Sequence, residues 1–175
     1  FGVPADICVI NTCTVTGRSA YQARQLIRRA FRANPEATIV AAGCYAQVLP
    51  EELAAMPEVS LILGTDEKMT LPERIEALAA GSCRLQVGDV GLVREMNFRA
   101  ASSFPGHTRA FLKIQDGCDA WCSYCIVPHA RGRSRSLPPE RVLEEIRHLG
   151  DAGFREVVLT GIHLGVYGRD LKAPS

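Results

Sequence analysis

Short apolar runs alternate with segments of helical periodicity along most of this chain, and this alternation is the strongest constraint on its fold. Three of the runs have the length and composition of strands buried on both faces: DICVI (6–10), TIVAA (38–42) and VSLIL (59–63). The helical segments between and after them run from Ser19 to Asn34, over 50–56 and over 71–80. Such alternation predicts a parallel sheet, so residues 1–81 are expected to form a small, doubly wound α/β domain.

The same alternation resumes near residue 109. AFLKI (110–114) and EVVLT (156–160) are predicted strands, and the helix between them starts at Pro139. Its predicted apolar face consists of Val142, Leu143, Ile146 and Leu149. Residues 82–108 have no sustained period and are predicted to be a linker. Residues 109–175 should therefore begin a second parallel α/β structure that stops after its second strand.

Composition excludes some classes of protein. Charged residues make up 22% of the 175 residues and the hydrophobic class 47%, as is ordinary for a soluble globular protein. No apolar run approaches the roughly 20 residues that span a bilayer, and no leader precedes the first strand. We therefore expect a cytoplasmic protein without a membrane partner. The net charge of +1 means that any basic surface must be local.

Cysteine is the most informative residue type. The count of seven is odd, and clustered cysteines in a protein that is not secreted favour metal ligands or catalytic thiols over disulfides. CDAWCSYC places Cys118, Cys122 and Cys125 in the loop after AFLKI, where parallel α/β folds assemble their sites. Three thiolates on a four-iron cluster leave one iron open for a substrate.

Two other interpretations of this triplet stay open. His129 follows Cys125 by four residues, so a closed Cys3His zinc site in a non-catalytic RNA-binding module is one alternative. An electron carrier of ferredoxin type is the other, although the lack of a fourth cysteine counts against a closed cluster. Three arginines in RGRSR (131–135) follow the triplet and could hold phosphates. The arginines of RQLIRRAFR (24–32) are more simply a solvated helix face.

Two further cysteines each follow a predicted strand. Cys13 lies just past the first strand and Cys44 just past the second, so both thiols could meet at the carboxyl edge of the sheet. The alternative is that each is a small buried side chain. That alternative is favoured for Cys8, which lies inside a strand, and for Cys83, at the edge of the predicted linker.

The wider motifs resemble a known family. C-x3-C-x2-C with an aromatic residue before its last cysteine is similar to the radical S-adenosylmethionine (SAM) motif. KIQDGCDAWCSYCIVPHARGRSRS (113–136) and LTGIHLGVYG (159–168) resemble the methylthiotransferase branch of that superfamily. The resemblance implies a partial barrel of about six βα units. It also implies a 4Fe–4S cluster on Cys118, Cys122 and Cys125 and SAM contacts from Tyr124, Thr160 and Gly161. Reduction of that cluster would cleave SAM to a radical.

The resemblance also implies a second, auxiliary 4Fe–4S cluster. Cys13 and Cys44 match the second and third of its three ligands, and the first lies upstream of this chain.

NTCTVT (11–16) is most like the enzymes that add a methylthio group to C2 of threonylcarbamoyladenosine in tRNA. Relatives acting on isopentenyladenosine, or on a ribosomal-protein aspartate, usually differ there. The implied partners are tRNA, SAM and an electron donor such as flavodoxin or ferredoxin. Because most of the barrel is absent, we expect this chain alone to be inactive.

Overall fold

The computed structural model describes residues 5–79, 84–97 and 108–171. The strands are β1 (Ile7–Thr12), β2 (Thr38–Gly43), β3 (Leu61–Leu63), β4 (Leu85–Gln86), β5 (Arg109–Lys113), β6 (Gln115–Asp116), β7 (Arg135–Ser136) and β8 (Glu156–Thr160). The helices are α1 (Gly17–Ala33), α2 (Cys44–Val48), α3 (Pro50–Ala54), α4 (Leu71–Ala79), α5 (Val127–Arg131) and α6 (Pro139–Asp151). Two 3-10 turns, η1 (Glu67–Thr70) and η2 (Leu164–Val166), complete the elements of the described chain. Cys83 and residue 80, the predicted end of the helix over 71–80, lie outside the described residues.

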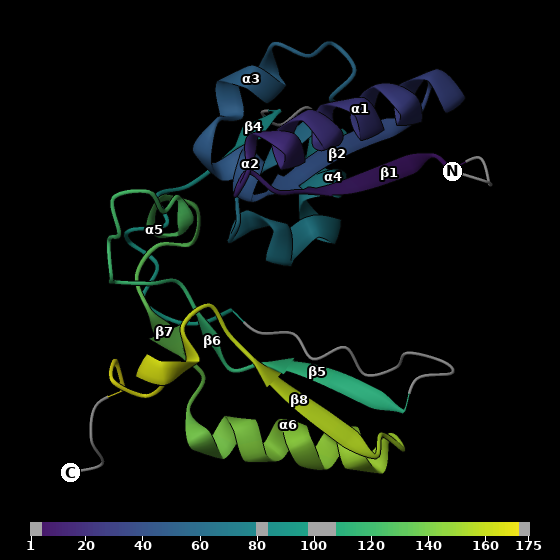
Figure 1. The fold of residues 1–175 in the computed structure, drawn as a ribbon. Coiled ribbons are helices and arrows are strands. Elements are labelled where there is room, and N and C mark those ends of the chain that lie inside the picture. Colours follow the sequence, from purple (N-terminus) through teal and green to yellow (C-terminus); the bar gives the residue numbers. More distant parts are fainter. Residues whose placement is uncertain (1–4, 80–83, 98–107, 172–175) are drawn as a thin grey trace.

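The first unit is a parallel sheet with helices on both faces, as the alternation predicts. Its strand order is β1-β2-β3-β4. Helices α1, α2 and α3 pack on one face around Ile39, Ala41 and Ile62, and α4 packs on the other against Val40 and Leu61. Figure 1 shows α1 and α3 on one side of this sheet and α4 on the other. The doubly wound α/β prediction is therefore confirmed for this unit.

Strand β1 differs from its prediction. It is an edge strand, and Ile7 and Val9 are 44% and 45% exposed, so the interpretation of DICVI as buried on both faces is wrong. The reason is that the α4 side of the core covers β2 and β3 and does not extend to β1. Cys8 points to the opposite face and packs against the α1 side of the core, which agrees with a structural role.

Helix α1 begins where a threonine caps it. Thr16 has extended backbone angles, and its hydroxyl accepts a hydrogen bond from the N–H of Ser19 at 3.1 Å, so the helix starts at Gly17, earlier than Ser19. It ends before Asn34-Pro35, as expected from the restriction that proline places on the preceding residue. Four residues of this helix are buried against the sheet: Ala20, Ala23, Ile27 and Ala30.

The segment expected to be a linker contributes to the first sheet. Leu85 and Gln86 pair with Ile62 and Leu63 as β4, so the first unit reaches Gln86, beyond the predicted end at residue 81. Met96, also in the expected linker, packs against the core of the second unit. Residues 98–107 lie outside the described residues. We propose that the boundary between the two units falls within 87–108.

The second unit is a strand–helix–strand unit. β5 and β8 pair in parallel over five residues each, and α6 packs on one face through Val142 and Leu149 against Ala110 and Leu112. The apolar face predicted for α6 is wrong at Leu143, which is 53% exposed, whereas Glu145 is buried. None of the helices described is long and apolar enough to cross a membrane.

Helix α5 lies between the two units (Figure 1). The Thr65 hydroxyl, on the first unit, donates a buried hydrogen bond of 2.7 Å to the carbonyl of Ala130 on α5. The segment that carries the three cysteines therefore contacts both units. The site predicted on the first unit and the site predicted on the second both lie near this junction.

Candidate functional site

The three-cysteine loop is closed at its base by a pair of two-residue strands that the sequence did not predict. β6 and β7 pair antiparallel, with Gln115 opposite Ser136 and Asp116 opposite Arg135. Just inside this pair, the N–H of Cys118 donates to the carbonyl of Gly132 at 3.1 Å. The loop therefore starts and ends beside the carboxyl end of β5. This is the position that was predicted for it from the sequence.

Gly117 makes this closure possible. Its φ of +73° lies in the region that favours glycine. A Cβ atom at this position would overlap the carbonyl oxygen and carbon of Arg133, which are backbone atoms of the segment that returns toward β7. The first turn of the cysteine loop therefore requires glycine both for its backbone angles and for the approach of the two chain segments.

The three thiols share this loop, although they are not gathered into a finished metal site. Cys118 and Cys125 are half-buried and Cys122 is exposed, with the N–H of Cys125 bonded to the carbonyl of Cys122 at 2.9 Å. Across the described ranges, no group of three or more His, Cys, Asp or Glu residues is arranged to hold a metal ion. The donor chemistry nevertheless fits an iron–sulfur cluster, because three soft thiolates lie on one tethered loop. The ligand assignment stays a prediction.

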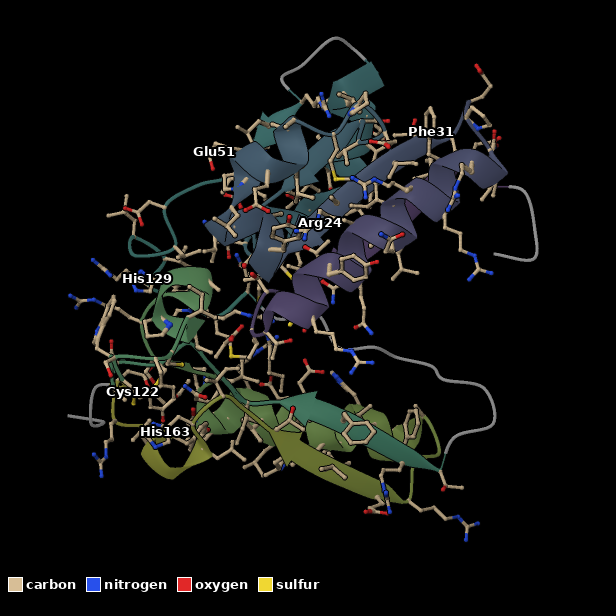
Figure 2. All side chains as sticks on the ribbon, turned by 45° about the horizontal axis from the view of Figure 1, so that its top comes forward. Arg24, Phe31, Glu51, Cys122, His129 and His163 are labelled. Carbon is tan, nitrogen blue, oxygen red and sulfur yellow. The ribbon has the colours of Figure 1, made fainter. Side chains whose placement is uncertain are left out.

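His129, the fourth ligand of the zinc alternative, lies on α5. Its imidazole packs edge-on against the ring of Trp121, with ring centroids 5.3 Å apart and an interplanar angle of 86°. Trp121 itself has a positive φ of 48°. Figure 2 shows Cys122, His129 and His163 at the same end of the second unit. The contact of His129 is therefore with an aromatic ring of the loop.

Gln115 holds the loop and the following turn together. Its side chain is completely buried, and its amide nitrogen donates to the carbonyls of Asp116 and Gly117 at 3.1 and 2.8 Å and to the Ser134 hydroxyl at 3.0 Å. Its amide oxygen accepts the N–H of His163 at 2.8 Å. Sequence reasoning missed this residue. The available signal was a polar side chain directly after a buried apolar strand.

The residues predicted to contact SAM separate into two groups. Thr160 and Gly161 line a cavity of about 230 Å³ at the carboxyl ends of β5 and β8. The other lining residues are Lys113, Gln115, Asp116, Arg131 and Ile162. A Cβ atom on Gly161 would meet Gln115 at 3.0 Å, so the turn after β8 packs directly on the buried amide. Tyr124, in contrast, is 90% exposed and does not line this cavity.

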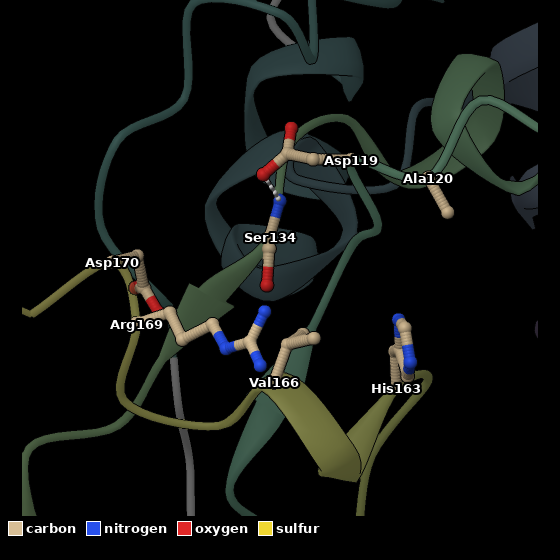
Figure 3. Close-up of a pocket in the computed structure, with 7 residues that line it drawn as sticks. All are labelled: Asp119, Ala120, Ser134, His163, Val166, Arg169 and Asp170. Carbon is tan, nitrogen blue, oxygen red and sulfur yellow. Dashed lines mark hydrogen bonds between the residues drawn. The ribbon is translucent and has the colours of Figure 1, made fainter.

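A second cavity, of about 320 Å³, lies between the cysteine loop and the segment after β8 (Figure 3). Asp119 and Ala120 of the loop line it, together with Ser134, His163, Val166, Arg169 and Asp170. The imidazole Nδ1 of His163 lies 3.8 Å from the sulfur of Cys118. His163, to which the sequence assigned no role, thus connects the cysteine loop with the turn after β8.

Cys13 and Cys44 both lie at the carboxyl edge of the first sheet. Thr12 and Gly43 are register partners at the ends of β1 and β2, and each cysteine follows its partner residue directly. Cys44 is buried and Cys13 is exposed. Their common edge agrees with the expectation from the strand pattern, whereas their role as ligands stays a prediction.

The junction between the units is strongly charged. Asp116 is buried and accepts hydrogen bonds from Lys113 at 2.8 Å and from the N–H of Gly117 at 2.9 Å. Burial pushes the pKa of this carboxyl upward, but the charges of Lys113 and Arg131 outweigh burial and lower the pKa below its ordinary value. Asp116 is therefore an anion that holds two cations beside the cavity.

The arginines predicted as phosphate contacts are divided by the structure. Arg133 is exposed, whereas Arg135 is buried and donates to the carbonyl of Arg131 at 2.9 Å. Arg131 is directed into the junction. Arg131 therefore lies beside the cavity at the junction and Arg135 is bonded to the backbone, so of the three only Arg133 is exposed, and their role as phosphate contacts stays a prediction. On α1, Arg24 bonds to Tyr45 and Glu52.

Lys68 is the least favourably placed cation of this junction, and its removal should stabilise the protein. Its pKa is lowered, first by burial and then by the charges of Arg131 and Lys113. Its amine donates to the Asn11 side chain at 3.3 Å. Lys68→Met is expected to raise the free energy of unfolding by roughly 1 kcal/mol at pH 7, measured by urea denaturation.

The pH dependence of that gain follows from the direction of the pKa shift. The folded protein binds the Lys68 proton more weakly than the unfolded chain does. The penalty is therefore fully present below the folded pKa and disappears as pH rises through it toward 10.5. The difference between variant and wild type should shrink over this range. An unchanged or lower stability of the variant at pH 7 would contradict the prediction.

Comparisons with known proteins agree with this geometry. The family described as "Uncharacterized protein family UPF0004" matches residues 2–64, and the "Radical SAM superfamily" matches residues 112–168. The chain is 43% identical over 98% of its length to the Bacillus subtilis (strain 168) protein "Threonylcarbamoyladenosine tRNA methylthiotransferase MtaB". It is 44% identical over 95% to the protein of the same name from Aquifex aeolicus (strain VF5). It is also 34% identical over 95% to "Ribosomal protein uS12 methylthiotransferase RimO" of Symbiobacterium thermophilum.

These matches define the class of protein. The strand–helix–strand unit with its three-cysteine loop is the part of the chain that matches the radical SAM superfamily. Over 95–98% of its length the chain is similar to proteins named as methylthiotransferases, and residues 112–168 match the radical SAM superfamily. It spans 38% of the length of the B. subtilis relative and 41% of the A. aeolicus one. The family implies SAM and 4Fe–4S clusters as cofactors.

Proposed function

We propose that this protein adds a methylthio group to C2 of threonylcarbamoyladenosine next to the anticodon of tRNA. The observation that carries the proposal is the three-cysteine loop, closed by β6 and β7 at the carboxyl end of β5 and joined through Gln115 to the turn that begins at Gly161. The names of the similar B. subtilis and A. aeolicus proteins support this substrate.

In this proposal Cys118, Cys122 and Cys125 hold the SAM-binding 4Fe–4S cluster. When bound, that cofactor supplies the one-electron chemistry that cleaves SAM. The protein's own residues shape the place where SAM lies. The cavity beside Thr160 and Gly161 offers charges of both signs from Lys113, Asp116 and Arg131, which suits a ligand with amino and carboxylate groups. Gln115 keeps the wall of this cavity and the cysteine loop at a fixed separation.

Cys13 and Cys44 are proposed as two of the three ligands of an auxiliary 4Fe–4S cluster. Their position at one sheet edge supports this. A flavodoxin or ferredoxin would provide electrons, and the site of action would be the cytoplasm. The electron donor is proposed because reductive cleavage of SAM consumes an electron, and the cytoplasm because the names of the B. subtilis and A. aeolicus relatives give tRNA as the substrate.

Anaerobic reconstitution tests the first cluster. Wild type is compared with a variant in which Cys118, Cys122 and Cys125 are all alanine, and iron, sulfide and the spectral response to SAM are measured. The variant should hold about four fewer irons per chain and give no SAM response. The zinc alternative predicts instead that zinc is bound and that His129→Ala abolishes binding. Equal iron in both proteins would refute the proposed cluster site.

The substrate is tested separately, with the complete coding sequence. It is expressed in bacteria that lack their own threonylcarbamoyladenosine methylthiotransferase, and tRNA nucleosides are analysed by mass spectrometry. Appearance of the methylthio form of threonylcarbamoyladenosine is the expected result. Methylthiolation of isopentenyladenosine alone would overturn the substrate while leaving the reaction class intact.

A further inference from the structure

One arginine side chain connects the two predicted cluster sites. The guanidinium Nε of Arg131, at the end of α5, donates to the sulfur of Cys44, at the start of α2, at 3.1 Å. Cys44 is buried with 7% exposure and the Arg131 side chain is 22% exposed, so this hydrogen bond is partly shielded from water. The neighbouring bond between Thr65 and the Ala130 carbonyl holds α5 against the first unit. The contact between Arg131 and Cys44 is therefore part of a packed junction.

The other side of the same guanidinium reaches the base of the three-cysteine loop. Nη1 of Arg131 lies 3.4 Å from the Asp116 carboxylate, which also accepts the N–H of Gly117, the residue before Cys118. Burial lowers the pKa of Arg131, but the charge of Asp116 leads the interactions that outweigh it and raise the pKa. Arg131 is therefore a permanent cation that contacts a thiol of one unit and a carboxylate of the other.

Only arginine among the cationic side chains suits this position. Its planar guanidinium presents several N–H groups in fixed directions, so it can donate to two acceptors that lie on different sides of it. A lysine amine is a point charge on a flexible stem and would have to favour one acceptor. Hydrogen bonds to ligand sulfur are among the factors that set the reduction potential of an iron–sulfur cluster.

We propose that Arg131 is a positioning residue that fixes the Cys44 sulfur relative to the three-cysteine loop. Its charged N–H also makes the group bound at Cys44 easier to reduce. This inference rests on the proposed function for its cluster part, since Cys44 is a ligand only in that proposal. Its geometric part concerns the two units of the protein and stands without any cofactor.

The geometric part is tested on the metal-free protein by amide hydrogen exchange. Arg131→Met removes both hydrogen bonds and the charge, and Arg131→Lys retains the charge alone. Arg133→Met, at an exposed arginine two residues along the chain, is the matched control. Exchange within 44–48 and 127–131 should rise about tenfold in Arg131→Met, which corresponds to about 1.4 kcal/mol of local opening. It should be unchanged in the control. Unchanged exchange in Arg131→Met would overturn the positioning role.

The cluster part is tested on the protein from the complete coding sequence. Alanine replaces Cys118, Cys122 and Cys125, so that iron is held only at the auxiliary site, and the potential is followed by electron paramagnetic resonance. Arg131→Met should shift the reduction equilibrium about tenfold toward the oxidised form, equivalent to about 59 mV for one electron. Arg131→Lys should recover part of the shift, and Arg133→Met none.

The possible failures of this experiment can be told apart. An unchanged potential in Arg131→Met, with iron bound, would overturn the tuning role and leave the proposed function intact. Absence of iron in the Cys-to-Ala protein before Arg131 is changed would refute the auxiliary-cluster assignment, and tuning with it. The exchange measurement decides the positioning role in either case.

Discussion

Replacing Gly117 with alanine is expected to lower the free energy of unfolding by roughly 3 kcal/mol and to prevent iron loading of the three-cysteine loop. Two effects add at this position. The positive φ of 73° disfavours a side chain, and the new Cβ would overlap the backbone carbonyl of Arg133. The β6–β7 pair that closes the loop would have to separate, so Cys118 would lose its fixed place relative to Cys122 and Cys125.

Gly153→Ala is the matched control for this experiment. Gly153 also has a positive φ, of 92°, but a Cβ atom added there would have no other atom within 4 Å. The control measures only the cost of placing a side chain on a residue with positive φ. It should lower the free energy of unfolding by only about 1 kcal/mol. Urea denaturation and iron content after reconstitution are the measurements. Equal losses of stability in both variants would show that the approach of Gly117 to Arg133 is unimportant.

The parts of this fold that follow from periodicity were predictable from the sequence. Alternation of apolar runs and helical segments identified the strands at 110–114 and 156–160 within one residue and placed Pro139 at the start of α6. These elements are long enough for burial to impose a period on their residues. The cysteine loop was placed correctly for the same reason, since it follows a recognisable strand.

Features that depend on which segments become neighbours were not predictable in this way. β6 and β7 are two residues each, too short to show a period, so the closure of the loop was missed. DICVI has the composition of a central strand, but its place at the sheet edge depends on strand order, and composition does not determine strand order. The inward direction of Arg131 is decided by Asp116 and Cys44, which are 15 and 87 residues away in the chain.

Gln115 shows how a single buried polar side chain can hold several segments of the site together. Its buried amide has four polar partners: the two N–H groups are shared among three acceptors, and the oxygen accepts one hydrogen bond. A buried polar group that loses its partner costs about 1–3 kcal/mol, and here one side chain serves several such groups. The partners include Gly117 and Ser134, at the two ends of the cysteine loop, and His163, in the turn after β8.

Gln115→Met is therefore expected to lower the free energy of unfolding by roughly 2–5 kcal/mol, although it preserves side-chain size. Gln22→Met, at an exposed position of α1, should change it by less than about 0.5 kcal/mol. Urea denaturation of the two variants beside the wild type measures both changes.

Positioning by Gln115 predicts more than a loss of stability. At a temperature where the variant is still folded, its cysteine loop and the 161–163 turn should no longer be held in a common geometry. The affinity for SAM after reconstitution should then fall at least about tenfold, because the cavity wall and the loop are no longer tied together. Iron content should fall less than this affinity, since the thiols remain. A folded variant that binds SAM as tightly as the wild type would contradict the positioning role and leave Gln115 as a purely structural residue.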